Sequence, residues 1–201
     1  MLLAVTSLKG GVGKTTTSVL TAFGLARDGT PTALVDANRQ QSAYRWTSRA
    51  GEMPFLTIPW EQGDQLARQV RQLAQQFTHV VVDTPPERED VARAAMAVAE
   101  QLIIPIAPNP GDVEQLRDTF GLATAVMDET GREFPARVLM TRVDNRTGDP
   151  DAVRAYLEQQ TVPRFKTEIR ELRAYARMYG AVPASLLEYE DLLAELTEPA
   201  P

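Results

Sequence analysis

The 201-residue chain is predicted to fold as one α/β domain, with a mostly parallel, twisted sheet and helices on both faces. Three observations predict this. Short apolar runs alternate with amphipathic segments along the chain, the first run leads into a glycine-rich loop, and two later runs end in an aspartate. No internal repeat, low-complexity stretch or long linker divides the sequence, so residues 1–201 are expected to form a single domain.

Apolar runs and helical periodicity define the expected elements. The predicted strands are Leu2–Thr6, Thr32–Asp36, Phe55–Ile58, His79–Asp83, Leu102–Ile106 and Ala136–Thr141. The predicted helices are Thr15–Arg27, Gln41–Arg49, Gln62–Gln76, Glu89–Glu100, Asp112–Glu129, Asp151–Gln159, Glu168–Met178 and Ser185–Thr197. The tail Glu198–Pro201 is expected to be disordered. Because ligands bind at the carboxyl ends of strands in such sheets, residues that follow the strands are the first candidates for a site.

Composition excludes several classes of protein. There is no cysteine, which excludes disulfides, thiolate metal sites and iron–sulfur clusters. The single histidine, His79, excludes a histidine-cluster metal site. No run approaches the roughly 20 apolar residues of a membrane span, so the expected location is the cytoplasm. The net charge is −6, and lysine occurs only at positions 9, 14 and 166, so two of the three lysines lie in one short loop.

That loop, Lys9-Gly10-Gly11-Val12-Gly13-Lys14-Thr15-Thr16, follows a predicted strand and opens a predicted helix. This is the context of a phosphate-binding loop, in which glycines let backbone N–H groups surround the phosphates at a helix N-terminus. Lys14 is expected to reach the β- and γ-phosphates, and the Thr15 hydroxyl to ligate Mg²⁺. The general motif has its first glycine where this chain has Leu8, so the loop is a variant.

Lys9 is the unusual residue of the loop, because a second ammonium must approach the same anion, project toward another one, or be a solvated surface lysine. The eight-residue segment resembles the deviant Walker A signature of the ParA/MinD ATPases, and the chain as a whole is most similar to small ParA-type partition ATPases. The resemblance implies ATP and Mg²⁺ as cofactors, with residues Gly10 to Thr16 holding the nucleotide. It also implies an ATP-dependent homodimer in which Lys9 contacts the ATP of the partner subunit and Gly11 lies near the dimer seam.

Two strand-end carboxylates are the candidate metal and catalytic groups. Asp83 precedes Thr84-Pro85-Pro86 and can hold the Mg²⁺ shell, which also matches the Walker B position of the family. Asp36 matches the first carboxylate of a family pattern, Asp-x-Asp-Pro-Gln, near the metal and the attacking water. Asn38 replaces the second carboxylate, which in the family positions that water. Asparagine keeps the shape but loses the charge, so we expect slow or disabled hydrolysis, whether the substitution is natural or engineered.

The adenine contacts are expected near the last predicted strand. By resemblance, Thr141, Arg142 and the segment containing Val162, Pro163 and Arg164 are candidates for flanking the base. Ordinary loop polarity is an alternative explanation for these residues.

Basic residues concentrate between positions 164 and 177 of this acidic protein. They are Arg164, Lys166, Arg170, Arg173 and Arg177. The last three are spaced three and four apart, which places them on one face of the predicted helix. The resemblance implies nonspecific binding of double-stranded DNA when both subunits of a dimer present this region. A solvated helix face with ion pairs inside the helix is the alternative.

These features favour a ParA-type ATPase for DNA partition or cargo positioning, with a ParB-like or other adaptor protein that triggers hydrolysis and a nucleoid-associated location. A MinD-like regulator of cell division is the alternative, but it would cycle on a membrane. The closing predicted helix is amphipathic and acidic, so anionic lipid should repel it, and no membrane partner is expected. A metabolic P-loop enzyme would have no need for Lys9.

Overall fold

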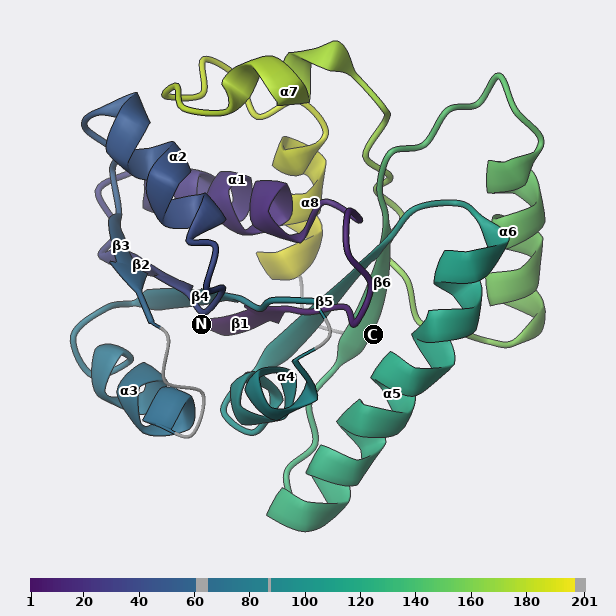
Figure 1. Cartoon of the computed structure of the whole chain (residues 1–201), viewed down its shortest axis with the longest axis horizontal. Helices are drawn as coiled ribbons and strands as arrows, with labels where there is room; N and C mark the ends of the chain where they lie inside the picture. The colour runs from purple at the N-terminus through teal and green to yellow at the C-terminus, as the bar shows by residue number, and fades with distance from the viewer. Residues whose placement is uncertain (61–64, 87, 198–201) are drawn as a thin grey trace.

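A six-stranded parallel sheet forms the centre of the molecule (Figure 1). The computed structural model describes residues 1–60, 65–86 and 88–197, and the predicted disordered tail Glu198–Pro201 lies outside these ranges. The strands are β1 (Leu2–Val5), β2 (Thr32–Asp36), β3 (Leu56–Pro59), β4 (His79–Asp83), β5 (Gln101–Ile106) and β6 (Ala136–Met140). Their order is β3-β2-β4-β1-β5-β6, and every adjacent pair is parallel. The predicted fold class is confirmed.

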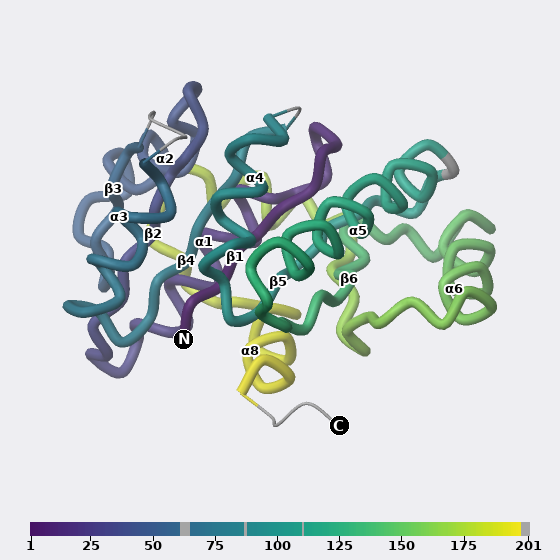
Figure 2. The backbone as a smooth tube through the Cα atoms, turned by 90° about the horizontal axis from the view of Figure 1, so that it is seen from below, coloured from purple at the N-terminus to yellow at the C-terminus, as the bar shows by residue number. Residues whose placement is uncertain are grey.

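Helices cover both faces of the sheet. On one side lie α1 (Lys14–Ala26), α2 (Ser42–Ala50), α7 (Arg173–Met178) and α8 (Tyr189–Thr197) (Figure 1). On the other side lie α3 (Leu66–Leu73), α4 (Glu89–Met96) and α5 (Pro110–Thr130), with α6 (Asp149–Gln159) beside the β6 edge. Figure 2, seen from below, shows α3, α4 and α5 side by side across the near face of the sheet. None of the helices in the described ranges is long and apolar enough to cross a membrane.

The strand sequences explain why an apolar core lies on each face of the sheet. Successive residues of a strand point to opposite faces, so a strand buried on both sides must be apolar throughout. In β1, Leu3 and Val5 enter the core beneath α1, α2 and α8, whereas Leu2 and Ala4 enter the core beneath α3, α4 and α5. The residues of β1 and β2 are all buried. Near-continuous apolar runs therefore mark the central strands.

Register brings the predicted site residues to one edge of the sheet. Asp83 at the end of β4 lies opposite Val5 of β1 on one side and Asp36 of β2 on the other. Both aspartates are fully buried or nearly so. The loop that leaves β1 therefore lies between the carboxylate of β4 and the C-terminal half of β5, at the position where parallel sheets bind ligands.

The helix predicted over Glu168–Met178 is wrong in its first half. Residues 163–171 run extended beside β6, where Phe165 N donates to Val138 O at 2.9 Å and Ile169 N donates to Met140 O at 2.8 Å. This segment supplies partners for the outer edge of β6 and buries the side chains of Phe165 and Ile169. Pairing with an open strand edge outweighs the helix propensity of the arginine- and glutamate-rich sequence. The helix α7 begins only at Arg173.

The closing helix is shorter than predicted, beginning at Tyr189 rather than Ser185. Its apolar side, made of Tyr189, Leu192, Leu193 and Leu196, is buried against α1 and the sheet. A Cβ added at Gly24 of α1 would lie 2.1 Å from Leu193 Cδ1, so glycine allows the two helices to pack closely. This acidic helix therefore packs on the core.

Candidate functional site

The phosphate loop connects β1 to α1 with two residues in the left-handed backbone region. Gly11 has φ +79° and Gly13 has φ +82°, conformations that side-chain-bearing residues rarely adopt. Gly13 is the N-cap of α1 and no side chain caps this helix end. The first-turn amides, together with the positive end of the helix dipole, thus point toward a place where an anion can bind. Leu8, which replaces the usual first glycine, packs against the core instead.

Lys14 is a buried cation in the first turn of α1. Its side chain is mostly hidden, with the whole residue 7% exposed, and its Nζ donates a hydrogen bond to the carbonyl of Lys9. Burial lowers the pKa of Lys14 to about 8, although the charges of Asp83 and Asp112 act in the opposite direction. A buried ammonium group with only a neutral backbone partner is stabilised by an incoming polyanion.

The Asp83 carboxylate accepts hydrogen bonds from two hydroxyl groups of α1. Thr15 Oγ1 donates to Asp83 Oδ2 at 2.8 Å, and Ser18 Oγ donates to Asp83 Oδ1 at 3.1 Å. Burial, followed by the nearby charge of Asp36, raises the pKa of Asp83 to about 7, against the lowering effects of these hydroxyls and of Lys14. Ser18 was not predicted from the sequence, yet it lies one helical turn after Lys14 and so faces the same strand end.

Asp36 is held by backbone amides at the start of α2. Tyr44 N donates to Asp36 Oδ2 at 2.9 Å, and Asn38 N donates to Asp36 Oδ1 at 3.1 Å. Burial raises the pKa of Asp36 above its ordinary value, and the hydrogen bonds from Tyr44, Asn38 and Ala43 oppose that shift. The side chain of Asn38 accepts a hydrogen bond from Gln40 N at 3.0 Å, which stabilises the turn before α2.

The chemistry of these groups fits Mg²⁺. This cation prefers hard oxygen ligands and usually binds through one or two carboxylates together with phosphate oxygens and water. Thr15 and Asp83 present such oxygens in contact with each other, and Asp36 lies on the adjacent strand. No cluster of three or more acidic or histidine ligands exists in the described part of the chain. The protein therefore offers only a partial shell, of the kind that a nucleotide's phosphates would complete.

Lys9 lies on the outer side of the same loop. Its side chain is 40% exposed, and its Nζ lies 4.0 Å from Asp112 Oδ1 near the start of α5. The Asp112 carboxylate is 3% exposed and also accepts a hydrogen bond from Ala107 N at 2.9 Å. No sequence pattern indicates that Asp112 faces the loop, because Lys9 and Asp112 are far apart in the chain. The two lysines thus differ in burial, because Lys14 is hidden in the loop whereas the Lys9 side chain is partly exposed.

A pocket of about 330 Å³ opens in front of the phosphate loop. The predicted residues that line it are Gly10, Gly11, Gly13, Lys14, Thr15, Thr16 and Asn38. Residues that sequence reasoning missed complete its wall, namely Gln40, Ser42, Trp46, Thr84, Pro86 and Tyr179. Tyr179 comes from the segment after α7, and only the fold brings it to this pocket.

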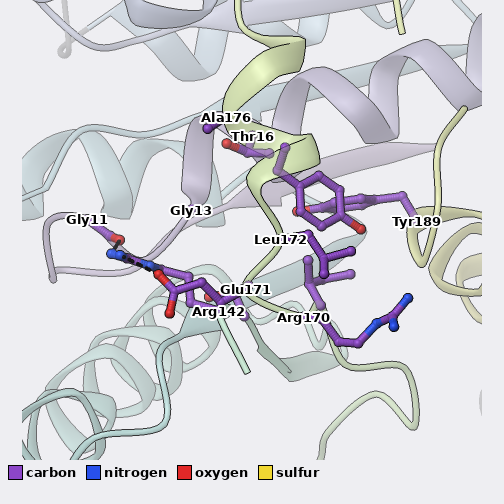
Figure 3. A pocket seen from close by; sticks show the side chains of 12 residues that line it. Gly11, Gly13, Thr16, Arg142, Arg170, Glu171, Leu172, Ala176 and Tyr189 are labelled. Atoms are coloured by element: carbon purple, nitrogen blue, oxygen red, sulfur yellow. Dashed lines mark hydrogen bonds and ion pairs between the residues drawn. The ribbon is translucent and has the colours of Figure 1, made fainter. Parts of the chain in front are cut away.

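A second pocket of about 290 Å³ lies on the other side of the loop and includes Gly11, Gly13 and Thr16 (Figure 3). Arg142 also lines this pocket and has a left-handed backbone, φ +56°. Its guanidinium donates to Gly11 O and to Glu171 Oε1, both at 3.1 Å, and so links the phosphate loop to the segment beside β6.

The residues predicted to flank the adenine do not all lie together in this structure. Thr141 lines the second pocket, but its hydroxyl is committed to the carbonyls of Val12 and Ile106. Pro163 lies elsewhere, beside Val138 in the middle of β6, where its carbonyl accepts a hydrogen bond from Val138 N at 2.9 Å. The remaining wall comes from residues that were not predicted for this role, namely Ile169, Arg170, Glu171, Leu172, Tyr175, Ala176 and Tyr189.

The predicted DNA-binding residues do not share one helix face. Arg170 lies in the extended segment and pairs with Glu188, and in Figure 3 its side chain extends away from Gly11 and Arg142. Arg164 pairs with Glu168 at 3.6 Å. Lys166 is exposed beside β6, and only Arg173 and Arg177 lie on α7, four residues apart. The shared face predicted for Arg170 is therefore wrong, because the helix begins after it.

The parallel sheet, the glycine loop and the carboxylate–threonine pair define a P-loop nucleotide-binding protein. Comparison with known proteins gives the family. Residues 3–180 match the CobQ/CobB/MinD/ParA nucleotide binding domain, and the chain belongs to this family.

Relatives within the family include proteins that distribute cellular bodies. The maintenance of carboxysome distribution protein A of Gloeobacter kilaueensis is 35% identical over 178 residues, covering 88% of this chain and 79% of the relative. The protein ParA of Rhizobium radiobacter is 24% identical over 182 residues, covering 89% of this chain and 82% of the relative. These relatives are ParA-like ATPases.

Solved structures show the same fold. Apo McdA of Cyanothece superposes with a TM-score of 0.76 at 20% identity, over 94% of each chain. The MinD cell division protein of Aquifex aeolicus gives a TM-score of 0.76 at 18% identity, over 99% of this chain and 98% of that one. A cobyrinic acid a,c-diamide synthase of Mycobacterium smegmatis, solved with ADP and magnesium, gives 0.75 at 18% identity, over 96% of this chain and 92% of the other.

Proposed function

We propose that this chain is a ParA-type ATPase that positions a cellular cargo. Mg²⁺ and ATP bind at the phosphate loop, two subunits associate face to face around two ATP molecules, and the dimer binds DNA without sequence preference. An adaptor protein of the ParB type, or another activator, stimulates hydrolysis and releases the dimer from the nucleoid. The similarity to carboxysome-distribution proteins and to ParA supports this proposal.

The observation that carries the proposal is the difference in burial between the two lysines. Lys14 is buried where it neutralises phosphate within its own subunit. Lys9 is 40% exposed on the outer side of the loop, and a contact of 4.0 Å to Asp112 is a weak restraint. An exposed cation beside a phosphate pocket can cross to a second subunit, whereas a metabolic enzyme with a single active site has no use for it. Lys9 is thus the residue that links ATP binding to dimerisation.

Gel filtration with and without Mg-ATP tests this link. The parent chain is expected to elute as a dimer only with Mg-ATP, and Lys9→Ala is expected to stay monomeric while its thermal shift on ATP binding persists. Arg71→Ala on α3 is the matched control, because it removes one exposed positive charge from the opposite side of the sheet. If Lys9→Ala dimerises with ATP as the parent does, the proposal is wrong.

Hydrolysis is expected to be slow in this chain. Asn38 lines the phosphate pocket where the ParA/MinD pattern has an aspartate, and an amide cannot accept a proton from water. Restoring the carboxylate with Asn38→Asp is expected to raise turnover, by up to the roughly 10²–10⁴-fold that general bases contribute. Phosphate release measured under saturating Mg-ATP tests this, and equal rates for the two proteins would remove Asn38 as the cause.

The alternative of a MinD-like membrane regulator has less support. A membrane-binding helix needs an apolar face toward lipid and basic residues beside it. In α8 the apolar residues Tyr189, Leu192, Leu193 and Leu196 are buried, and the helix carries Glu190, Asp191 and Glu195. The described part of the chain therefore offers no helix of this kind at its C-terminal end.

A further inference from the structure

Two arginines of α2 stand out among the charged residues that the proposed function does not use. Arg45 and Arg49 are exposed and lie four residues apart, so they occupy one face of the helix. Arg173 and Arg177 have the same spacing and exposure on α7. Figure 1 shows α2 and α7 on the same side of the sheet. We name these four residues the α2–α7 arginine face.

Direct contacts join α2 to the segment that follows α7. Trp46 Nε1 donates to Ala181 O at 3.2 Å, and the rings of Trp46 and Tyr179 lie 5.5 Å apart. The Arg49 guanidinium lies 5.8 Å from the centre of the Tyr179 ring, and a Cβ at Gly180 would meet Arg49 Cβ at 3.4 Å. The segment that directly follows α7 therefore packs on α2, which brings Arg49 beside the C-terminal end of α7.

The charges of this face are not neutralised locally. Within the described residues, none of its four arginines forms an ion pair. The other arginines of the same region differ, since Arg164 pairs with Glu168 and Arg170 pairs with Glu188. A protein with a net charge of −6 that leaves four guanidinium groups together without acidic partners has a local site for a polyanion.

We infer that the α2–α7 arginine face is the surface that contacts the phosphates of double-stranded DNA, and that Arg45 and Arg49 are principal contacts alongside Arg173 and Arg177. This inference rests on the DNA binding in the proposed function and assigns it to residues. Guanidinium groups bind phosphate oxygens through paired hydrogen bonds, which suits a repeating phosphate backbone. A lipid surface is the poorer match, because the apolar residues Tyr175 and Met178 of α7 pack on the core and cannot insert into a bilayer.

The α2–α7 arginine face lies next to the phosphate pocket. Helix α2 begins at Ser42, which lines that pocket with Asn38, and Trp46 and Tyr179 line it too. A nucleotide in this pocket would lie against α2 and against Tyr179, the residue that follows α7. ATP can in this way orient α2 and α7 relative to each other, in addition to joining two faces in the dimer.

The test compares two double variants of equal charge change. Arg45→Ala with Arg49→Ala removes the α2 pair. Arg68→Ala with Arg71→Ala removes two exposed arginines from α3 on the other side of the sheet, which form no ion pair within the described residues. Binding to a short labelled duplex of arbitrary sequence is measured by fluorescence anisotropy with Mg-ATP, between about 50 and 200 mM salt. A thermal shift with Mg-ATP verifies that each variant folds and binds nucleotide.

The α2 variant is expected to lose affinity at least about tenfold and to show a salt slope shallower by about 1.8 per subunit, since each lost phosphate contact contributes about 0.9. The α3 variant is expected to match the parent. Equal losses in the two variants, or none in the α2 variant, overturn the assignment while DNA binding by the parent still stands. A parent that dimerises with ATP but binds only anionic phosphatidylserine vesicles, and no DNA, overturns the proposed DNA binding and the assignment together.

Discussion

Charged residues differ in burial and pairing between two regions of the molecule. One is the carboxyl edge of the sheet beside the phosphate loop, here called the phosphate edge, and the other is the region that follows β6. At the phosphate edge, Lys14, Asp36 and Asp83 are buried. Burial lowers the pKa of Lys14 and raises the pKa values of both aspartates, so each shift favours the neutral form. After β6, Arg164 and Arg170 are exposed or partly exposed and each has a carboxylate partner. Buried charges destabilise the protein until a ligand compensates them, whereas paired surface charges need no ligand. This difference distinguishes a binding site from a solvated surface.

Removing the buried cation should have the largest effect. Lys14→Ala deletes the ammonium group that we expect to reach the β- and γ-phosphates, and hydrogen bonds to charged groups contribute about 1.5–3 kcal/mol each. We expect ATP affinity to fall by roughly a hundredfold. Isothermal titration calorimetry measures this. Retention of parent-like ATP affinity would show that the buried lysine does not contact the phosphates. The contrast between a binding site and a solvated surface would then no longer apply to this residue.

Removing a buried carboxylate should separate stability from binding. The pKa of Asp83 is raised from 3.8 to about 7 in the folded protein, so its ionised form destabilises the fold as pH rises across this window. Without nucleotide, Asp83→Asn should melt higher than the parent above pH 7, by roughly 2–4 °C for each kcal/mol relieved, and the difference should shrink toward pH 4. With Mg-ATP the order should reverse, because the amide has no charge for the cation.

Differential scanning fluorimetry over this pH range, with and without Mg-ATP, provides the measurement for Asp83→Asn. Thr57→Ser, a mild change on β3 away from the phosphate edge, is a control for general effects of substitution in a strand. A variant that is less stable than the parent at every pH would contradict the view that the carboxylate is a strained group.

Removing a paired surface charge should have the smallest effect. Arg170→Ala breaks the ion pair with Glu188, which involves a half-exposed arginine, so we expect a loss of only about 0.2–1 kcal/mol in the free energy of unfolding. DNA affinity should be nearly unchanged. Urea denaturation and anisotropy measure the two quantities, and a large loss of DNA affinity with intact stability would place Arg170 among the DNA contacts.

The sequence predicted the fold and the phosphate edge well, because both depend on local patterns. Apolar runs marked six strands, and glycines at positions that need positive φ marked the loop before α1. Contacts between distant segments could not be predicted in this way. Residues 163–171 pair with β6, although the first half of a helix was predicted to begin within this segment. Asp112 and Tyr179 reach the site only through tertiary packing. Single-sequence patterns carry no information on which strand edge a segment will cover.

Lys9 is expected to act on the ATP of a second subunit, and mixing two inactive variants tests this most directly. Lys9→Ala keeps Lys14 for its own nucleotide, and Lys14→Ala keeps Lys9 for its partner. Sedimentation velocity with a fluorescent label on the Lys9→Ala protein measures association in Mg-ATP. Each variant alone should remain monomeric, and the mixture should form labelled heterodimers with one complete site. A mixture that stays monomeric, while each protein folds and the parent dimerises, would contradict action across the interface.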